Sequence, residues 1–103
     1  MGYVYLINAS GTKNYKIGST SRTVNERICE LQTGNSEELL FVNSYLTENY
    51  RKLEIWLHRK YRTKRKEGEW FELEDEEVKI FENTCKTIDK TITLLLENNP
   101  FFN

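Results

Sequence analysis

Apolar and polar residues alternate along the start of the chain in the manner of a β-hairpin. The first run, residues 3–7, places its odd-numbered and even-numbered side chains on opposite faces of a strand. A polar segment with a glycine, residues 8–14, separates it from a second alternating run at residues 15–20. Gly18 lies inside the second run, where a glycine weakens a strand unless something must approach the backbone closely. The hairpin is therefore a candidate site as well as a structural unit.

The next two patterns predict a helix and a third strand. Thr23 and Glu26 have the spacing of a capping box, so we expect a helix that starts there, runs to about Thr33 and ends at Gly34. Residues 38–46 are rich in apolar and aromatic side chains and favour a strand. Three antiparallel strands with helices on their faces are enough to close a core.

A second helix is predicted over residues 48–62, whose apolar side chains recur at helical spacing. Glu54 and His58 are four residues apart and share a strip beside that apolar side. Residues 64–68 read as a charged loop, and residues 69–73 as a short extended piece that carries two aromatic rings. This part of the chain thus places a carboxylate and an imidazole together on one helix.

Residues 75–98 predict one long helix, because their apolar positions step alternately by three and four. This seam fits either packing along the body of the protein or a homodimer formed through the helix. The whole pattern predicts a single domain over residues 1–98, with a body at 1–73, the long helix at 75–98 and a tail at 99–103. The expected fold class is α+β: a three-stranded antiparallel sheet flanked by helices, with a long C-terminal helix. The seam consists of Val78, Phe81, Cys85, Ile88, Ile92 and Leu95.

Composition supports a folded domain of this kind. The chain has 103 residues, 38% of them apolar and 13% aromatic, which suits one modest core. The sequence shows neither a membrane-spanning run nor a signal-like start, so we expect an intracellular protein, cytoplasmic or nuclear, without a membrane partner.

The net charge of −1 conceals a strong asymmetry. Residues 1–66 hold twelve Lys and Arg against six Asp and Glu, a balance of +6, whereas residues 67–103 hold three against ten, a balance of −7. Between residues 51 and 66, eight basic residues face a single acid, Glu54. Such a basic stripe is typical of a surface that binds a polyanion, although a solvated helix face followed by a charged loop would look the same.

The triplets Tyr3-Val4-Tyr5 and Lys16-Ile17-Gly18, followed by Arg27, Glu54 and Glu69-Trp70-Phe71, form an ordered set. This set resembles the GIY-YIG nuclease family over residues 3 to about 73. The Lys-Ile-Gly form of the second triplet is similar to the branch of that family found in phage and large-DNA-virus proteins. Each triplet keeps the third residue of the family pattern and differs at its first.

The resemblance implies a metal-dependent endonuclease that hydrolyses DNA phosphodiester bonds. By that resemblance Tyr5 is the general base or orients the attacking water, Lys16 occupies the second-strand site, and Arg27 clamps the scissile phosphate. Glu54 holds one divalent metal ion, Mg²⁺ or Mn²⁺, and a lone carboxylate with waters and phosphate suits such an ion. Glu54 has a plainer reading as the balance of the surrounding cations.

His58 is a candidate catalytic residue because it follows Glu54 by four positions, with a packed helix histidine as the alternative. The family has a tyrosine where this chain has Lys16, and a lysine relays a proton only if its pKa is lowered. A catalytically weak or inactive nucleic-acid-binding module on the same fold is therefore the second reading. We expect the partner to be DNA rather than RNA. The residues predicted to bind it are Lys16, Gly18, Arg27, Arg51, Arg59, Arg62 and Lys64.

Overall fold

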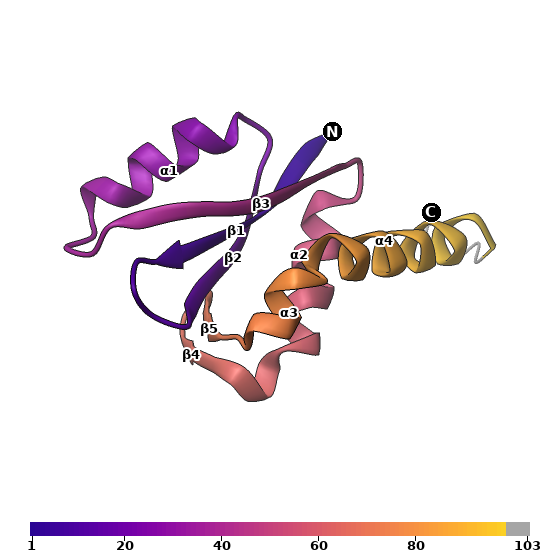
Figure 1. The fold of residues 1–103 in the computed structure, drawn as a ribbon. Helices are drawn as coiled ribbons and strands as arrows, with labels where there is room; N and C mark the ends of the chain where they lie inside the picture. Colours follow the sequence, from indigo (N-terminus) through magenta and orange to yellow (C-terminus); the bar gives the residue numbers. More distant parts are fainter. Residues whose placement is uncertain (99–103) are drawn as a thin grey trace.

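The computed structural model of the protein describes residues 1–98, so the predicted tail at 99–103 lies outside the described residues. The strands form one central sheet, and the helices lie around it (Figure 1). In chain order they are β1 (Gly2–Ala9), β2 (Asn14–Thr20), α1 (Val24–Thr33), β3 (Leu39–Thr47), α2 (Tyr50–Lys60), the 3₁₀ helix η1 (Arg62–Lys64), β4 (Arg65–Glu67), β5 (Trp70–Glu72), α3 (Asp75–Lys79) and α4 (Phe81–Asn98).

The sheet has five strands in the order β3-β1-β2-β5-β4, all antiparallel, so the predicted three-stranded sheet is wrong. The predicted hairpin is confirmed as β1 and β2, and the predicted third strand is confirmed as β3, which pairs with β1. The two further strands come from the segments expected to be a charged loop and a short extended piece. β4 consists of Arg65, Lys66 and Glu67, all exposed, and therefore carries no apolar alternation to reveal it. Gly68, at φ +55°, turns the chain so that β5 can pair with β4 and β2.

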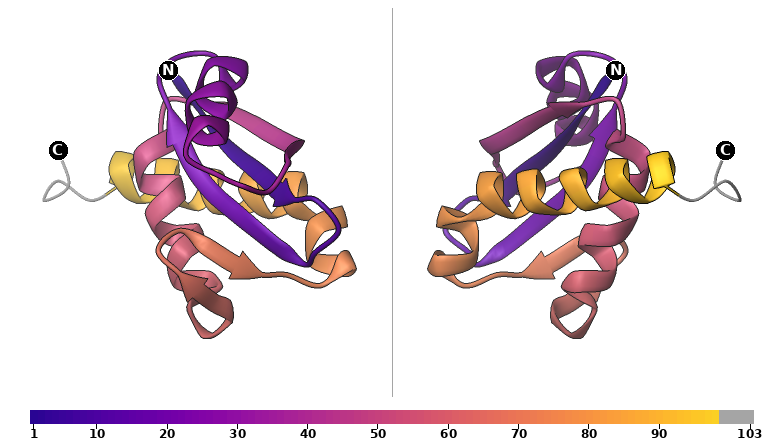
Figure 2. Two further views of the ribbon diagram at one scale, coloured as in Figure 1. Left: turned by 90° about the vertical axis from the view of Figure 1, so that its left-hand side faces the viewer. Right: turned by 90° about the vertical axis from the view of Figure 1, so that its right-hand side faces the viewer.

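Alternation along β1 divides the core between the two faces of the sheet. Val4 and Leu6 lie in the larger cluster with Leu53, Phe71 and Phe81, on the face covered by α2 and α4. The other face is covered by α1 and holds a smaller cluster. Figure 2 shows α1 on one side of the sheet and α2 and α4 on the other. The buried residues of the smaller cluster are Tyr5, Ile7 and Leu39.

Helix α1 follows the prediction closely. The Thr23 side chain accepts a hydrogen bond from the Glu26 backbone N–H (3.2 Å), and the helix stops at Thr33 with Gly34 as its C-cap. None of its residues is fully buried, and Val24, Ile28 and Leu31 form its half-buried inner side. Helix α1 therefore rests on the sheet without a deeply inserted side chain.

The single helix expected over residues 75–98 is wrong, because the backbone breaks at Ile80 (φ −94°, ψ 9°) into α3 and α4. The sequence around Ile80 contains no glycine or proline, so local propensity does not mark the break. Contacts with residues distant in sequence hold α3 and α4 in place, and these contacts differ for the two helices. Glu77 in α3 accepts a hydrogen bond from Lys64 (2.6 Å), while Phe81 at the start of α4 is fully buried in the core.

The seam of α4 packs inward over most of its length. Phe81, Cys85 and Ile92 are buried, and the Asp89 carboxylate accepts hydrogen bonds from the Tyr45 and Thr47 hydroxyls of β3 (3.0 and 2.9 Å). Burial, together with that carboxylate, raises the pKa of Tyr45 to about 12. Towards its C-terminal end α4 extends beyond the sheet (Figure 1), and Leu94 and Leu95 are exposed there. The homodimer through residues 75–98 stays a prediction.

Within residues 1–98, no helix combines the length and the apolar character that crossing a membrane requires.

Candidate functional site

The site is built around Gly18 in β2, which pairs with Tyr5 in β1. A Cβ at Gly18 would lie 2.8 Å from Tyr5 Cε1 and closer still to the phenol hydroxyl, so the ring occupies the space of the absent side chain. β5 pairs with residues 14–16 of β2, so this pairing ends before Gly18. The bare glycine therefore lies where the strand edge opens.

Arg27 approaches Gly18 from the α1 side of the sheet. Its Nε donates a long hydrogen bond to the Tyr5 hydroxyl (3.4 Å), and its Nη1 pairs with Glu30 (3.1 Å). The Arg27 side chain remains 35% exposed, whereas Tyr5 is 1% exposed. Burial raises the pKa of Tyr5; the Arg27 guanidinium opposes this, and the negative charges of Glu69 and Glu54 add to it. The phenol is therefore neutral at neutral pH, and the predicted pair of Tyr5 and Arg27 is formed.

Glu54 approaches the same strand from the α2 side. The Ser19 hydroxyl, one residue after Gly18 and on the opposite face of β2, donates a short hydrogen bond to Glu54 Oε1. Burial raises the pKa of Glu54, the Ser19 hydrogen bond lowers it, and the neighbouring Glu69 carboxylate raises it again. Glu54 is thus a half-buried carboxylate held in place by a hydrogen bond, as metal-binding carboxylates commonly are.

His58 lies one helical turn beyond Glu54, and both of its ring nitrogens have hydrogen-bond partners. Nε2 is 2.8 Å from the Ile17 carbonyl oxygen, and Nδ1 is 3.1 Å from Nη2 of Arg65. A guanidinium only donates and a carbonyl only accepts, so in this arrangement Nδ1 accepts and Nε2 donates. Nε2 of His58 also lies 3.6 Å from Glu54 Oε2, so the ring supports the carboxylate and keeps neither nitrogen free for a metal ion.

Glu69 is a second carboxylate at the site. Its Oε2 pairs with Lys16 Nζ (3.1 Å), and Lys16 also lies over the Trp70 ring (5.7 Å to its centroid). Burial raises the pKa of Glu69, but the bond and charge of the Lys16 ammonium outweigh it and hold that pKa below its usual range. Lys16 is consequently occupied by a carboxylate, with its side chain 13% exposed.

A ligand atom from each of Glu54, His58 and Glu69 lies within 4.8 Å of the other two. Two half-buried carboxylates this close repel each other unless a proton or a cation lies between them. Oxygen ligands of this kind suit Mg²⁺ and Mn²⁺. The residues present therefore fit a divalent metal ion, which Glu54 and Glu69 together would hold, rather than Glu54 alone.

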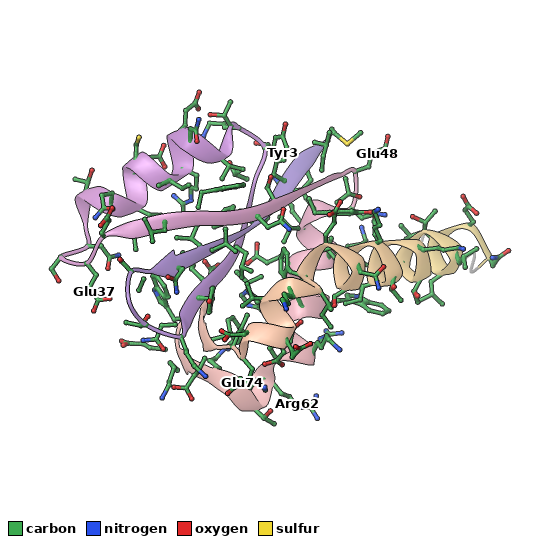
Figure 3. All side chains as sticks on the ribbon, viewed as in Figure 1. Tyr3, Glu37, Glu48, Arg62 and Glu74 are labelled. Atoms are coloured by element: carbon green, nitrogen blue, oxygen red, sulfur yellow. The ribbon has the colours of Figure 1, made fainter. Side chains whose placement is uncertain are left out.

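The structure separates the other predicted nucleic-acid-binding residues into groups. Lys16, Gly18 and Arg27 lie at the site, but Lys64 forms an ion pair with Glu77 at 2.6 Å. Arg51 stacks on Tyr50 at the beginning of α2, whereas Arg59 and Arg62 lie at and beyond its far end. Figure 3 shows Arg62 and Glu48 at opposite ends of that helix.

Three residues at the site were not predicted from the sequence: Ser19, Glu69 and Arg65. Alternation does place Ser19 on the opposite face from Gly18, where α2 later packs, so that signal was present. Glu69 directly precedes the Trp70-Phe71 pair and would be found by pairing that segment with β2. Arg65 lies on the unpredicted strand β4, and no local pattern indicates its contact with His58.

Comparison with protein families matches residues 2–92 to the T5orf172 domain. Comparison with curated proteins and with solved structures finds no match. The matched segment begins in β1 and ends within α4, so it contains every residue of the site described above. The family is associated with an endonuclease-type fold in phage proteins, which supports a nuclease-related or DNA-binding module. The chain belongs to the T5orf172 domain family.

Proposed function

We propose that the protein is a divalent-metal-dependent endonuclease that hydrolyses DNA phosphodiester bonds, as the resemblance to GIY-YIG nucleases implies. One observation carries the proposal. Tyr5 and Arg27 reach Gly18 from one face of the sheet, while Ser19, Glu54 and His58 reach the same strand from the other. A guanidinium and a pair of carboxylates thus approach the same strand from its two faces, next to a glycine.

Arg27 stabilises the phosphate in this proposal. Its guanidinium is exposed enough to meet a substrate, and its planar donors suit the oxygens on which negative charge grows as water attacks phosphorus. The hydrogen bond from Nε to the Tyr5 hydroxyl sets the plane of the guanidinium. The neutral phenol keeps its own hydrogen and orients the attacking water, whose proton passes to solvent, since the raised pKa of Tyr5 leaves almost no phenolate to act as a base at neutral pH.

Glu54 and Glu69 hold the metal ion, which when bound polarises the phosphate and offsets charge on the leaving oxygen. The Ser19 hydroxyl and the His58 ring fix the Glu54 carboxylate from two sides. Lys16 acts on Glu69: its ammonium keeps that carboxylate ionised and so ready to bind a cation. His58 is a positioning residue here.

A nucleic-acid-binding module without cleavage is the second candidate. The observation that favours it is the ion pair between Lys16 and Glu69, because it leaves no phenol or free amine at the second-strand position. Binding that weakens steeply with salt, together with intact plasmid under every divalent metal tried, would select this reading.

The test is nicking of supercoiled plasmid in Mg²⁺ or Mn²⁺ by the wild type, Glu54→Ala, Arg27→Ala and Tyr5→Phe. We expect Glu54→Ala and Arg27→Ala each to lose about 10²-fold or more in rate, the size typical of removing one group that stabilises developing charge. Glu97→Ala, an exposed acid on α4, is the matched control and keeps the wild-type rate. Cleavage that survives both Glu54→Ala and Tyr5→Phe would rule out this site.

A further inference from the structure

A hollow of about 370 Å³ lies beyond the carboxylate pair, at the far end of α2. Its lining comes from α2, η1 and β4 and consists of Ile55, His58, Arg59, Arg62 and Arg65. At about 30 Å³ per water molecule, it holds a phosphate group together with its waters. Three of its five lining residues are arginines, and none is acidic.

The charge of these arginines is not balanced within the part of the chain that the structure describes. Seven other basic residues there pair with a glutamate: Lys13, Lys16, Arg22, Arg27, Lys64, Lys66 and Lys86. Over residues 1–98, Arg59, Arg62 and Arg65 form no such ion pair, although the protein has 16 acidic residues to offer. Like charges around one hollow repel each other, and an anion relieves that repulsion.

A purely structural role explains only part of this arrangement. Arg62 Nη1 donates to the Arg59 carbonyl (3.3 Å) and so satisfies one group at the end of α2. A guanidinium has five N–H donors, so most of those of Arg62 remain. Arg65 is fixed by the Phe71 ring (5.4 Å to its centroid) and by His58 Nδ1. A fixed, planar donor group of this kind is already arranged to bind a phosphate.

The hollow adjoins the proposed catalytic site through one shared residue. His58 lines the hollow, and its ring contacts Glu54 on its other side. We propose that the hollow binds the backbone phosphate that neighbours the scissile phosphate on the same DNA strand. The hollow lies one turn of α2 further along from Glu54. This inference rests on the proposed function for the position of the scissile phosphate. Because a phosphate carries no sequence information, a contact to it fixes the register of the strand without reading its sequence.

The experiment measures binding in EDTA, where cleavage cannot occur. The affinity of a fluorescein-labelled DNA duplex is followed by anisotropy over a salt series for the wild type, Arg59→Gln and Arg62→Gln. Each phosphate contact contributes about 0.9 to the slope of log K against log salt, so we expect each variant to flatten the slope by about that amount. Lys90→Gln on α4 makes the same change in charge away from the hollow, and we expect the wild-type slope.

A second arm separates strand phosphate from a small anion. Inorganic phosphate is added to the wild type, to Arg59→Gln and to Arg62→Gln, and the thermal midpoint of each is recorded, which also shows that both variants fold. Unchanged slopes, or an equal change in Lys90→Gln, would overturn the proposal. A midpoint that phosphate raises only when Arg62 is present, with unchanged DNA slopes, would also overturn it by assigning the hollow to a small anion. Because binding is read without metal, flattened slopes beside an uncut plasmid would refute the nuclease and keep the hollow as a DNA contact.

Discussion

The two faces of the sheet differ in the local stability of the elements that carry the site residues. The α2 and α4 face contains the large core, in which Leu53, Phe71 and Phe81 are fully buried. The α1 face contains a small cluster, and α1 itself contributes no fully buried residue. Local stability follows buried apolar contact, so α1 should open at a lower free energy than α2.

Because of this difference, the two proposed functional groups of the site lie on elements of different local stability. Glu54, the proposed metal ligand, lies on the α2 and α4 face together with His58, which positions it, and metal ligands need fixed geometry. Arg27 lies on α1, and in the proposed function a small movement would let its guanidinium follow the phosphate as its charge changes. The Tyr5 hydroxyl limits that movement by accepting the hydrogen bond from Arg27 Nε. One strand, β2, thus joins a rigid half-site to an adaptable one.

The largest expected effect tests the comparison directly. Phe81→Ala removes a fully buried ring from the large core and should lower the free energy of unfolding by about 3–5 kcal/mol. Ile28→Ala removes a half-buried side chain from α1 and should cost about 1 kcal/mol. Denaturant unfolding of both variants measures the difference. Equal losses would show that the two faces are equally firm.

Gly18→Ala attacks the point where the two half-sites meet. The added methyl group would displace the Tyr5 ring, which belongs to a buried cluster, so we expect a loss of about 1–3 kcal/mol in stability. Displacing the ring also removes the partner of Arg27, so cleavage should fall more than stability alone explains. Gly34→Ala is the matched control, since a Cβ there meets nothing within 4 Å and its φ is −95°. Gly34→Ala should match the wild type in plasmid nicking, and an active Gly18→Ala would contradict this account of the glycine.

Local signals were sufficient for the elements that carry their own pattern. Alternation marked β1 and β2 and the cap marked α1, whereas Tyr5, Arg27 and Glu54 were named through the resemblance to GIY-YIG nucleases. The remainder depends on pairing between distant segments. β4 is three exposed polar residues and becomes a strand only because Gly68 turns it against β5. Glu69 joins the site by the same pairing, and the break at Ile80 follows from contacts made on its two sides.

The smallest expected effect concerns the firm half-site and has the opposite sign. Glu54→Gln removes one of two neighbouring carboxylates but keeps an oxygen to accept the Ser19 hydrogen bond. In EDTA at neutral pH we expect a gain of about 0.5–1 kcal/mol in the free energy of unfolding, as removal of a costly functional group often gives. Glu69→Gln, which deprives Lys16 of its partner, should instead lose stability.

The pH dependence identifies the cause of that gain. The pKa of Glu54 is raised above 4.5, chiefly by burial, so its ionised form costs the folded wild type stability at neutral pH. As pH falls through that raised pKa the wild type takes up its proton, and its deficit relative to Glu54→Gln should vanish. The pKa of Glu69 is lowered in the folded protein, so Glu69 contributes stability when the pH is above the usual pKa of a glutamate. Both proteins lose this contribution as the pH falls further, through the lowered pKa of Glu69. Adding Mg²⁺ at neutral pH should reverse the order, because a cation between the carboxylates stabilises the wild type by mass action and finds one ligand fewer in the variant. Two results together would show that the two carboxylates do not form a cation site. In these results Mg²⁺ leaves the melting temperature of the wild type unchanged, and Glu54→Gln is no more stable than the wild type in EDTA.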